Sequence, residues 1–172
     1  LEISSNPTER AKKIGAANTL IFKKGKIYAD NTDGIGFLNN LTQLAPDWKA
    51  DLGPAVVLGA GGASRSIVYS LLNEGAPKVI LTNRTDERAK KLSNIFGEKV
   101  LVINWENINK HISGINTLVN TTTLGMVGSS NLEIDLSTLS SNTLVTDIVY
   151  NPLKTPLLED ANRIGCKTVD GL

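Results

Sequence analysis

The chain has 172 residues, of which 41% are hydrophobic and 20% charged, and its 18 basic and 17 acidic side chains give a net charge of +1. This length suits one domain with a well-buried core, or one domain with a piece of another. The sequence has no basic patch typical of nucleic-acid binding and no apolar run near the roughly 20 residues that span a bilayer. With one cysteine and one histidine, we expect a cytoplasmic protein without a disulfide or a metal site.

The first fifty residues predict a mixture of short elements. Residues 8–14 have the pattern of the end of a helix, and 19–22 that of a strand leading into a lysine-rich turn at 23–26. The apolar spacing over 35–44 indicates an amphipathic helix. The proline and the glycine within 45–53 are typical of a linker.

Beyond residue 53, short β-branched runs alternate regularly with helical stretches. Strands are predicted at 54–58, 79–82, 100–103, 117–120, 144–149 and 167–169. Helices are predicted at 63–74, 86–96, 106–111 and 156–164. Thr85 precedes the second of these helices and is expected to cap it. The alternation predicts an α/β fold with a Rossmann-like, doubly wound parallel sheet that is covered on both faces.

A glycine-rich turn follows the first strand of this sheet and opens the next helix. The first glycine of such a turn allows a tight bend, the second lets the backbone approach a pyrophosphate, and the helix N-terminus supplies free amides. Ser64 takes the place of the usual third glycine and is small enough for close packing. We therefore predict a nucleotide-binding turn formed by Gly59, Ala60, Gly61, Gly62 and Ala63.

The residues after the second strand of the sheet indicate which nucleotide binds. NAD sites usually carry an acid there for the ribose 2′-hydroxyl, whereas this chain has Asn83, Arg84 and Thr85. Arg88 follows one helical turn after Arg84, and two guanidinium groups can close around a 2′-phosphate. The nearby Asp86 belongs to the first helical turn, where it favours the helix dipole. We therefore predict NADP rather than NAD as the cofactor.

Several segments, taken together and in order, resemble motifs of the shikimate dehydrogenase family. The family motifs GAxNT, DNTDG, GAGGA and NRT match residues 15–19, 30–34, 59–63 and 83–85. Its NxTxxGM, DxxYxPxxTPL and DGxxML motifs resemble 120–126, 147–157 and the final residues 170–172. The joint occurrence of these motifs, from about residue 8 to the end of the chain, makes the resemblance specific.

The resemblance implies NADPH-dependent reduction of 3-dehydroshikimate to shikimate, in aromatic amino-acid biosynthesis, within a cleft between a catalytic domain and a cofactor domain. Carried over by motif, Asn18 and Asp33 contact substrate hydroxyls, and Asp33 also pairs with a lysine that shuttles the catalytic proton. Tyr150 lines the substrate side of the cleft. The further cofactor-binding residues that the resemblance implies are Thr121, Met126 and Gly171.

The resemblance also implies how the chain divides into domains. Residues 1–50 correspond to the C-terminal part of the catalytic domain with a linker, and 51–172 to the cofactor domain, truncated at its C-terminal end. The family's catalytic lysine would fall before Leu1, and its substrate-binding glutamine beyond Leu172. We therefore expect a fragment that lacks the catalytic lysine and has little or no activity on its own.

Two alternatives stay open. One is a quinate/shikimate dehydrogenase, since nothing in the sequence excludes quinate as a substrate. The other is a module that binds NADP without chemistry. The expected partners are small molecules, with neither nucleic acid nor membrane among them, and the chain is expected to be a monomer or a homodimer.

Plainer interpretations apply to several residues when the resemblance is set aside. Asp33 fits a turn aspartate, Tyr150 a buried residue at a strand end, and Met126 a core residue. His111 fits a surface position on a helix. Cys166 fits a small buried apolar residue.

Overall fold

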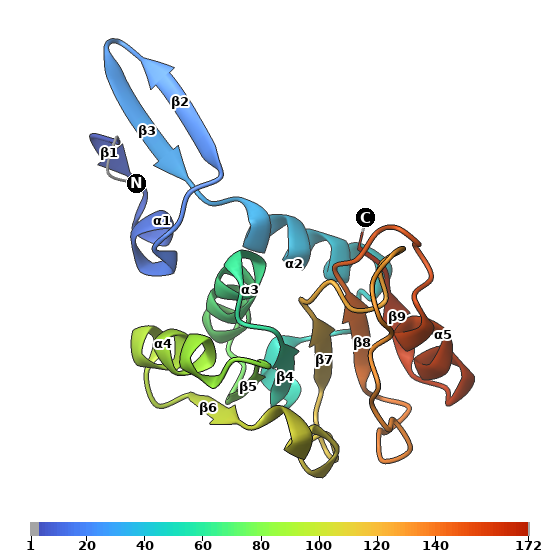
Figure 1. The fold of residues 1–172 in the computed structure, drawn as a ribbon. Coiled ribbons are helices and arrows are strands. Elements are labelled where there is room, and N and C mark those ends of the chain that lie inside the picture. Colours follow the sequence, from blue (N-terminus) through green and yellow to red (C-terminus); the bar gives the residue numbers. More distant parts are fainter. Residues whose placement is uncertain (1–3, 172) are drawn as a thin grey trace.

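The structure, a computed structural model, describes residues 4–171, so Leu172 of the last motif lies outside the described part of the chain. Its centre is a six-stranded parallel sheet in the order β6-β5-β4-β7-β8-β9 (Figure 1). The strands are β4 (Ala55–Leu58), β5 (Val79–Thr82), β6 (Val100–Ile103), β7 (Thr117–Asn120), β8 (Leu144–Asp147) and β9 (Lys167–Val169). This architecture confirms the predicted Rossmann-like, doubly wound α/β fold.

The strand order places a switch point in the middle of the large sheet. From β4 the chain runs outward to β5 and β6, and it then crosses back so that β7, β8 and β9 lie on the other side of β4. Leu58 at the end of β4 pairs with Asn120 at the end of β7. Because open parallel sheets bind ligands at the carboxyl ends of the strands beside such a switch point, the functional site is expected there.

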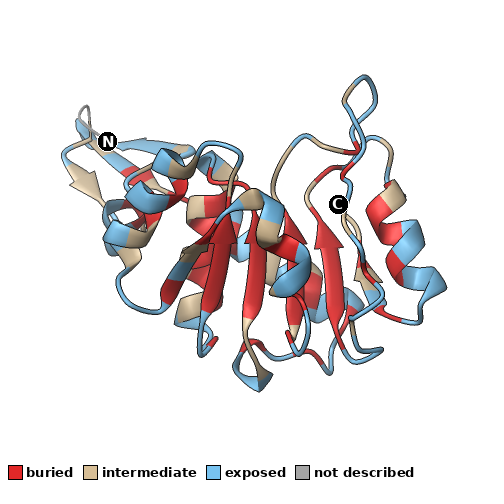
Figure 2. Cartoon of the chain, turned by 60° about the horizontal axis from the view of Figure 1, so that its bottom comes forward, coloured by how far each residue is buried: buried red, intermediate tan, exposed pale blue. Residues whose placement is uncertain are grey.

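Helices and loops cover both faces of the large sheet. The strands β4, β5, β7 and β8 are buried at every position, as the sheet interior in Figure 2 shows, which is typical of parallel strands packed on two sides. One face is covered by α2 (Asp33–Leu44), α3 (Gly62–Asn73) and α4 (Asp86–Phe96). The other is covered by the 3-10 helix η2 (Trp105–Lys110), parts of the 121–143 segment and α5 (Pro156–Arg163). Two hydrophobic cores therefore hold the sheet in place.

A smaller three-stranded sheet precedes the large one. Its order is β1-β3-β2, from β1 (Asn6–Pro7), β2 (Thr19–Lys23) and β3 (Lys26–Asp30). The strands β2 and β3 form an antiparallel hairpin that extends away from the large sheet (Figure 1). The side chain of Thr8 caps the short helix α1 (Glu9–Ile14) beside this sheet. From the hairpin, α2 leads back to the large sheet.

Several boundaries differ from the sequence-based expectations. The helix α2 begins at Asp33, two residues before its predicted start, because the Asn31 side chain accepts the Asp33 N–H at 3.2 Å. Asp33 is therefore a helical residue and not a turn aspartate. The strand β8 ends at Asp147 because the Asp147 carboxylate accepts the Val149 N–H at 3.0 Å and turns the chain. The helix expected at 106–111 is the 3-10 helix η2, and β1 and β3 were not predicted.

The 45–53 segment connects α2 to β4, but it packs into the core and is not a loose linker. Ala45, Trp48 and Ala50 are buried, and a short 3-10 helix, η1, covers Ala50–Leu52. The Trp48 indole N–H donates to Thr117 Oγ at 2.9 Å. This bond fixes the end of α2 against the start of β7.

The start of α2 lies unusually close to α3. A Cβ added at Gly34 would overlap Ser70 Oγ and would lie 2.9 Å from the Ser66 carbonyl oxygen. Only a residue without a side chain fits between the two helices at this distance. The contact fixes the first turn of α2, and therefore Asp33, against the helix that follows the glycine turn.

Replacing Gly34 tests this contact. We expect Gly34→Ala to lower the free energy of unfolding by about 1–3 kcal/mol, because the added methyl group must push α2 away from α3. Gly36→Ala is the matched control: an added Cβ meets no atom within 4 Å there, and losing a mid-helix glycine should stabilise by about 0.5–1 kcal/mol. Urea denaturation measures both changes. If the two substitutions change the free energy of unfolding equally, Gly34 is not in close contact with α3.

Candidate functional site

The predicted glycine turn joins β4 to α3 at the carboxyl edge of the sheet. Gly59 has a φ of +106°, and a Cβ there would lie 2.7 Å from Thr121 Oγ. Gly61 is the N-cap of α3, no side chain caps this helix, and an added Cβ at Gly61 or Gly62 meets nothing within 4 Å. The first amides of a helix carry a partial positive charge. The turn thus offers an open backbone surface that fits a pyrophosphate, with Ala60 and Ala63 on either side of the glycine pair.

Asn83 connects the glycine turn to the loop after β5. Its Oδ1 accepts the Ala60 N–H at 3.1 Å, and its Nδ2 donates to the Thr85 carbonyl oxygen at 2.9 Å. Both ends of the amide therefore bond to protein groups. Asn83 shapes the turn, whatever else it contacts when a nucleotide is bound.

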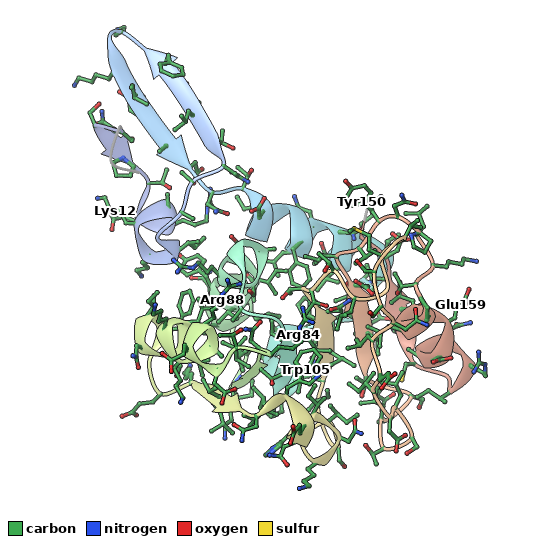
Figure 3. The ribbon with its side chains drawn as sticks, viewed as in Figure 1. Lys12, Arg84, Arg88, Trp105, Tyr150 and Glu159 are labelled. Carbon is green, nitrogen blue, oxygen red and sulfur yellow. The ribbon has the colours of Figure 1, made fainter. Side chains whose placement is uncertain are left out.

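Arg84 and Arg88 are exposed at the start of α4 (Figure 3). Within residues 4–171 neither guanidinium takes part in an ion pair. Thr85 is the N-cap residue of α4, as predicted, although its side chain makes no capping hydrogen bond. Two cations and a hydroxyl thus lie beside a helix start, an arrangement that can receive a phosphate.

Asn18 and Asp33 contact each other directly. The Asn18 amide donates to Asp33 Oδ1 at 2.6 Å, and its Oδ1 accepts from the Thr32 N–H at 3.0 Å and the Thr32 hydroxyl at 3.2 Å. Asn18 comes from the loop between α1 and β2, and Asp33 is the first residue of α2. Both side chains are exposed, so the pair can offer donors and acceptors to a polyhydroxylated ligand.

A cavity of about 450 Å³ lies between α2, α3 and the carboxyl edge of the sheet. Asp33 lines one part of it, Ala63 of the glycine turn another, and Gly171 a third. A Cβ on Gly171 would lie 2.7 Å from the Ile148 carbonyl oxygen, so a glycine is needed for this close approach. The structure therefore brings a substrate-side candidate and two cofactor-side candidates to one cavity.

A second, smaller cavity of about 260 Å³ holds the other candidates, Thr121, Met126 and Tyr150. Ile148 lines both cavities, which are therefore neighbours. Tyr150 is 66% exposed and Met126 39%, so neither is the buried residue that the plainer interpretation expected. Figure 3 shows Tyr150 well separated from Arg84 and Arg88.

Asp147 is a residue of the site to which the sequence analysis gave no role. Its carboxylate is fully buried and lines the larger cavity. Oδ1 accepts from Asn120 Nδ2 and from the Val149 N–H, each at 3.0 Å, and Oδ2 accepts from the Thr155 hydroxyl at 2.8 Å. Burial raises the pKa of this carboxyl, although the three hydrogen bonds act in the opposite direction. Its position at the carboxyl end of a buried strand was the signal available in the sequence.

The remaining candidates behave as structural residues. Cys166 is buried, which confirms the interpretation as a small apolar residue, and His111 is half-buried just after η2. Over the described residues, 4–171, no three or more His, Cys, Asp or Glu side chains gather as a metal site would require. No helix in that range is both long and apolar enough to cross a membrane.

The raised pKa of Asp147 predicts a pH dependence of stability. Above the ordinary pKa of an aspartate, the folded state keeps a proton that the unfolded state has lost, so the free energy of unfolding falls as the pH rises through the raised pKa. We expect Asp147→Asn to lose less stability than the wild type as the pH rises above about 4, the ordinary pKa of an aspartate. The asparagine amide can donate to Thr155 while its oxygen keeps the other two bonds. The free energy of unfolding of both proteins is measured by urea denaturation at several pH values. If it changes with pH in the same way for both, Asp147 does not titrate as expected.

Comparisons with known proteins show what this chain is similar to. A shikimate dehydrogenase (NADP(+)) of Roseobacter denitrificans is 54% identical over 173 aligned residues, which cover all of this chain and 62% of that protein. The structure of quinate dehydrogenase from Corynebacterium glutamicum in complex with NAD has a TM-score of 0.91 at 30% identity, over 99% of this chain and 62% of that one.

A further similar structure is shikimate 5-dehydrogenase from Thermus thermophilus in complex with NADP(H) and shikimate. It has a TM-score of 0.82 at 33% identity, over 98% of this chain and 60% of that one. The chain thus spans about 62% of the length of the curated relative described above. A family model for shikimate/quinate 5-dehydrogenase matches residues 45–170. Since this match covers more than half of the sequence, the chain belongs to the shikimate/quinate 5-dehydrogenase family.

Proposed function

We propose that this chain forms the NADP-binding part and one wall of the substrate site of an NADP-dependent shikimate dehydrogenase, which reduces 3-dehydroshikimate to shikimate. The observation that carries the proposal is the cavity of about 450 Å³ shared by Asp33, Ala63 and Gly171. In this cavity a polar ligand bound beside Asp33 would contact a nucleotide bound at the glycine turn. The names of the relatives supply the substrate class and the cofactor.

The residues of the cofactor side fit NADP. The open amides at Gly61 and Gly62 would receive the pyrophosphate, and Arg84, Thr85 and Arg88 would hold the 2′-phosphate. When bound, NADPH supplies the hydride for carbonyl reduction. Gly171, with the second cavity around Thr121 and Met126, would flank the nicotinamide end, opposite the arginines.

On the substrate side, Asp33 and Asn18 would orient hydroxyl groups. The bond between them holds the Asp33 carboxylate in one orientation, and a carboxylate accepts strongly from hydroxyl donors. Following the family, Asp33 also pairs with a lysine that carries the proton, and Tyr150 lines the open side of the cleft. In this proposal residues 1–50 belong to the substrate-binding domain and 51–172 to the cofactor domain.

A second candidate is a quinate/shikimate dehydrogenase, because the quinate dehydrogenase structure with NAD is so similar to this chain. The pair Arg84 and Arg88 favours NADP, and a comparison of quinate with shikimate as substrates decides between the two activities. A module that binds NADP without chemistry would bind the cofactor and oxidise neither substrate. We further propose a cytoplasmic protein, monomeric or homodimeric, whose assembly size-exclusion chromatography determines.

Cofactor preference tests the first half of the proposal. We expect Arg84→Ala to weaken NADPH binding roughly tenfold or more while NADH binding changes little, because one charge-assisted contact to the 2′-phosphate contributes about 1.5–3 kcal/mol. Isothermal titration calorimetry measures both affinities. Lys90→Ala, which removes another exposed cation of α4, is the control and should change neither affinity. Equal losses for NADPH and NADH would contradict the assignment of the 2′-phosphate site.

Turnover of the full-length gene product tests the second half. We expect it to oxidise shikimate with NADP⁺, and Asp33→Asn to lower kcat by about 10²-fold or more, the scale of general acid–base contributions. The Kd for NADP⁺ should stay within about threefold, since Asp33 lies on the substrate side of the cavity. Steady-state kinetics and cofactor titration on the same sample give both numbers. Weakened cofactor binding with normal turnover would make Asp33 a structural residue only.

A further inference from the structure

Asn31 is a buried amide beside the site that the proposed function does not use. It is 2% exposed and lies between β3 and α2. Its Nδ2 donates to the Ala16 carbonyl oxygen at 3.4 Å, and its Oδ1 accepts from the Ser66 hydroxyl at 2.9 Å and from the Asp33 N–H at 3.2 Å. One side chain thus joins the loop before β2, the first residue of α2 and the middle of α3.

Asn31 caps α2 in place of the residue that normally does so. Thr32 occupies the N-cap position but makes no capping bond, and its hydroxyl is within 3.2 Å of Asn18 Oδ1 instead. The first N–H groups of a helix need an outside acceptor, and Asn31 Oδ1 is that acceptor for Asp33. The Asp33 backbone is therefore held by Asn31, while its carboxylate is held by Asn18.

Ser66 connects this arrangement to the cofactor side. It is fully buried in α3, four residues after Gly62 at the start of the same helix. Its backbone carbonyl also forms part of the close contact with Gly34. The start of α2 is thus attached to α3 twice, by a hydrogen bond and by close packing.

We propose that Asn31 and Ser66 are a positioning pair through which the helix after the glycine turn holds Asp33 in place at the substrate cavity. The inference rests on the proposed function, because it takes Asp33 to act on the substrate and α3 to bind the cofactor. Neither Asn31 nor Ser66 lines the cavity, so both act through Asp33.

Two serines on the same helix provide a matched test in the full-length gene product. Ser66→Ala removes the hydroxyl group that donates a hydrogen bond to Asn31 Oδ1. Ser70→Ala removes a hydroxyl group one helical turn further along α3, which lies beside Gly34. With shikimate and NADP⁺, we expect Ser66→Ala to lower kcat about tenfold with the Kd for NADP⁺ within about twofold, because misplacing a reacting group costs turnover rather than cofactor binding. Ser70→Ala should keep kcat within about twofold of the wild type, because the Ser66 carbonyl oxygen still limits the approach of α2 at Gly34.

Two further measurements distinguish positioning from a general loss of structure. In the Asp33→Asn background, Ser66→Ala should cause no further loss of kcat, because the group that it positions is no longer there. The amide hydrogen of Asp33, followed by NMR, should exchange about tenfold faster in Ser66→Ala than in Ser70→Ala, since its acceptor is less firmly held.

The outcomes separate this inference from the function on which it rests. A gene product that neither binds NADP⁺ nor oxidises shikimate overturns the proposed function and this inference with it. An active enzyme that is sensitive to Asp33→Asn, yet responds alike to Ser66→Ala and Ser70→Ala, overturns the inference alone. Additive losses in the Asp33→Asn/Ser66→Ala double variant also overturn it, because they show that Ser66 acts independently of Asp33.

Discussion

The close packing of α2 on α3 at Gly34 is the constraint on which both sides of the site depend. The same helix, α3, has an uncapped N-terminus, which we propose receives the cofactor, and supports Asp33 across the cavity. A side chain at position 34 would move α2 outward and enlarge the space between these two features. The dimensions of the cavity therefore depend on the absence of one side chain and on the hydrogen bond between Asn31 and Ser66.

The carboxyl edge of the sheet is held together by a buried carboxylate. Asp147 accepts from Asn120 on β7 and from Thr155 at the start of α5, so the loops that carry Met126 and Tyr150 are anchored at one side chain. Burying a charge without hydrogen bonds is costly, and the donors around Asp147 offset part of that cost. The part of the cost that these donors do not offset raises the pKa of the Asp147 carboxyl. Raised pKa values of this kind are common among groups in functional clefts.

The large sheet could be predicted from the sequence because each of its elements carries a local signal. Buried parallel strands are short apolar runs, and the turn at Gly59 requires a glycine for its own backbone conformation. The features that were missed include two that depend on distant partners. The strand β1 is defined by its pairing with β3, in which Asn6 lies opposite Tyr28, and the bond from Ser66 to Asn31 joins residues 35 positions apart. Neither contact can be inferred from the local sequence on either side of it.

In the proposed function, the charged groups that would select the cofactor lie apart from those that would orient the substrate. Arg84 and Arg88 belong to the loop after β5 and the start of α4, and neither lines the cavity that contains Asp33. If Arg84 and Arg88 hold the 2′-phosphate as proposed, a substitution in that loop changes cofactor recognition without moving Asn18 or Asp33, which are held by each other and by Asn31. Similar structures bound to NAD and to NADP(H) are consistent with such independence. Under the proposed function, the fold would thus allow cofactor preference to vary while the orientation of Asp33 is retained.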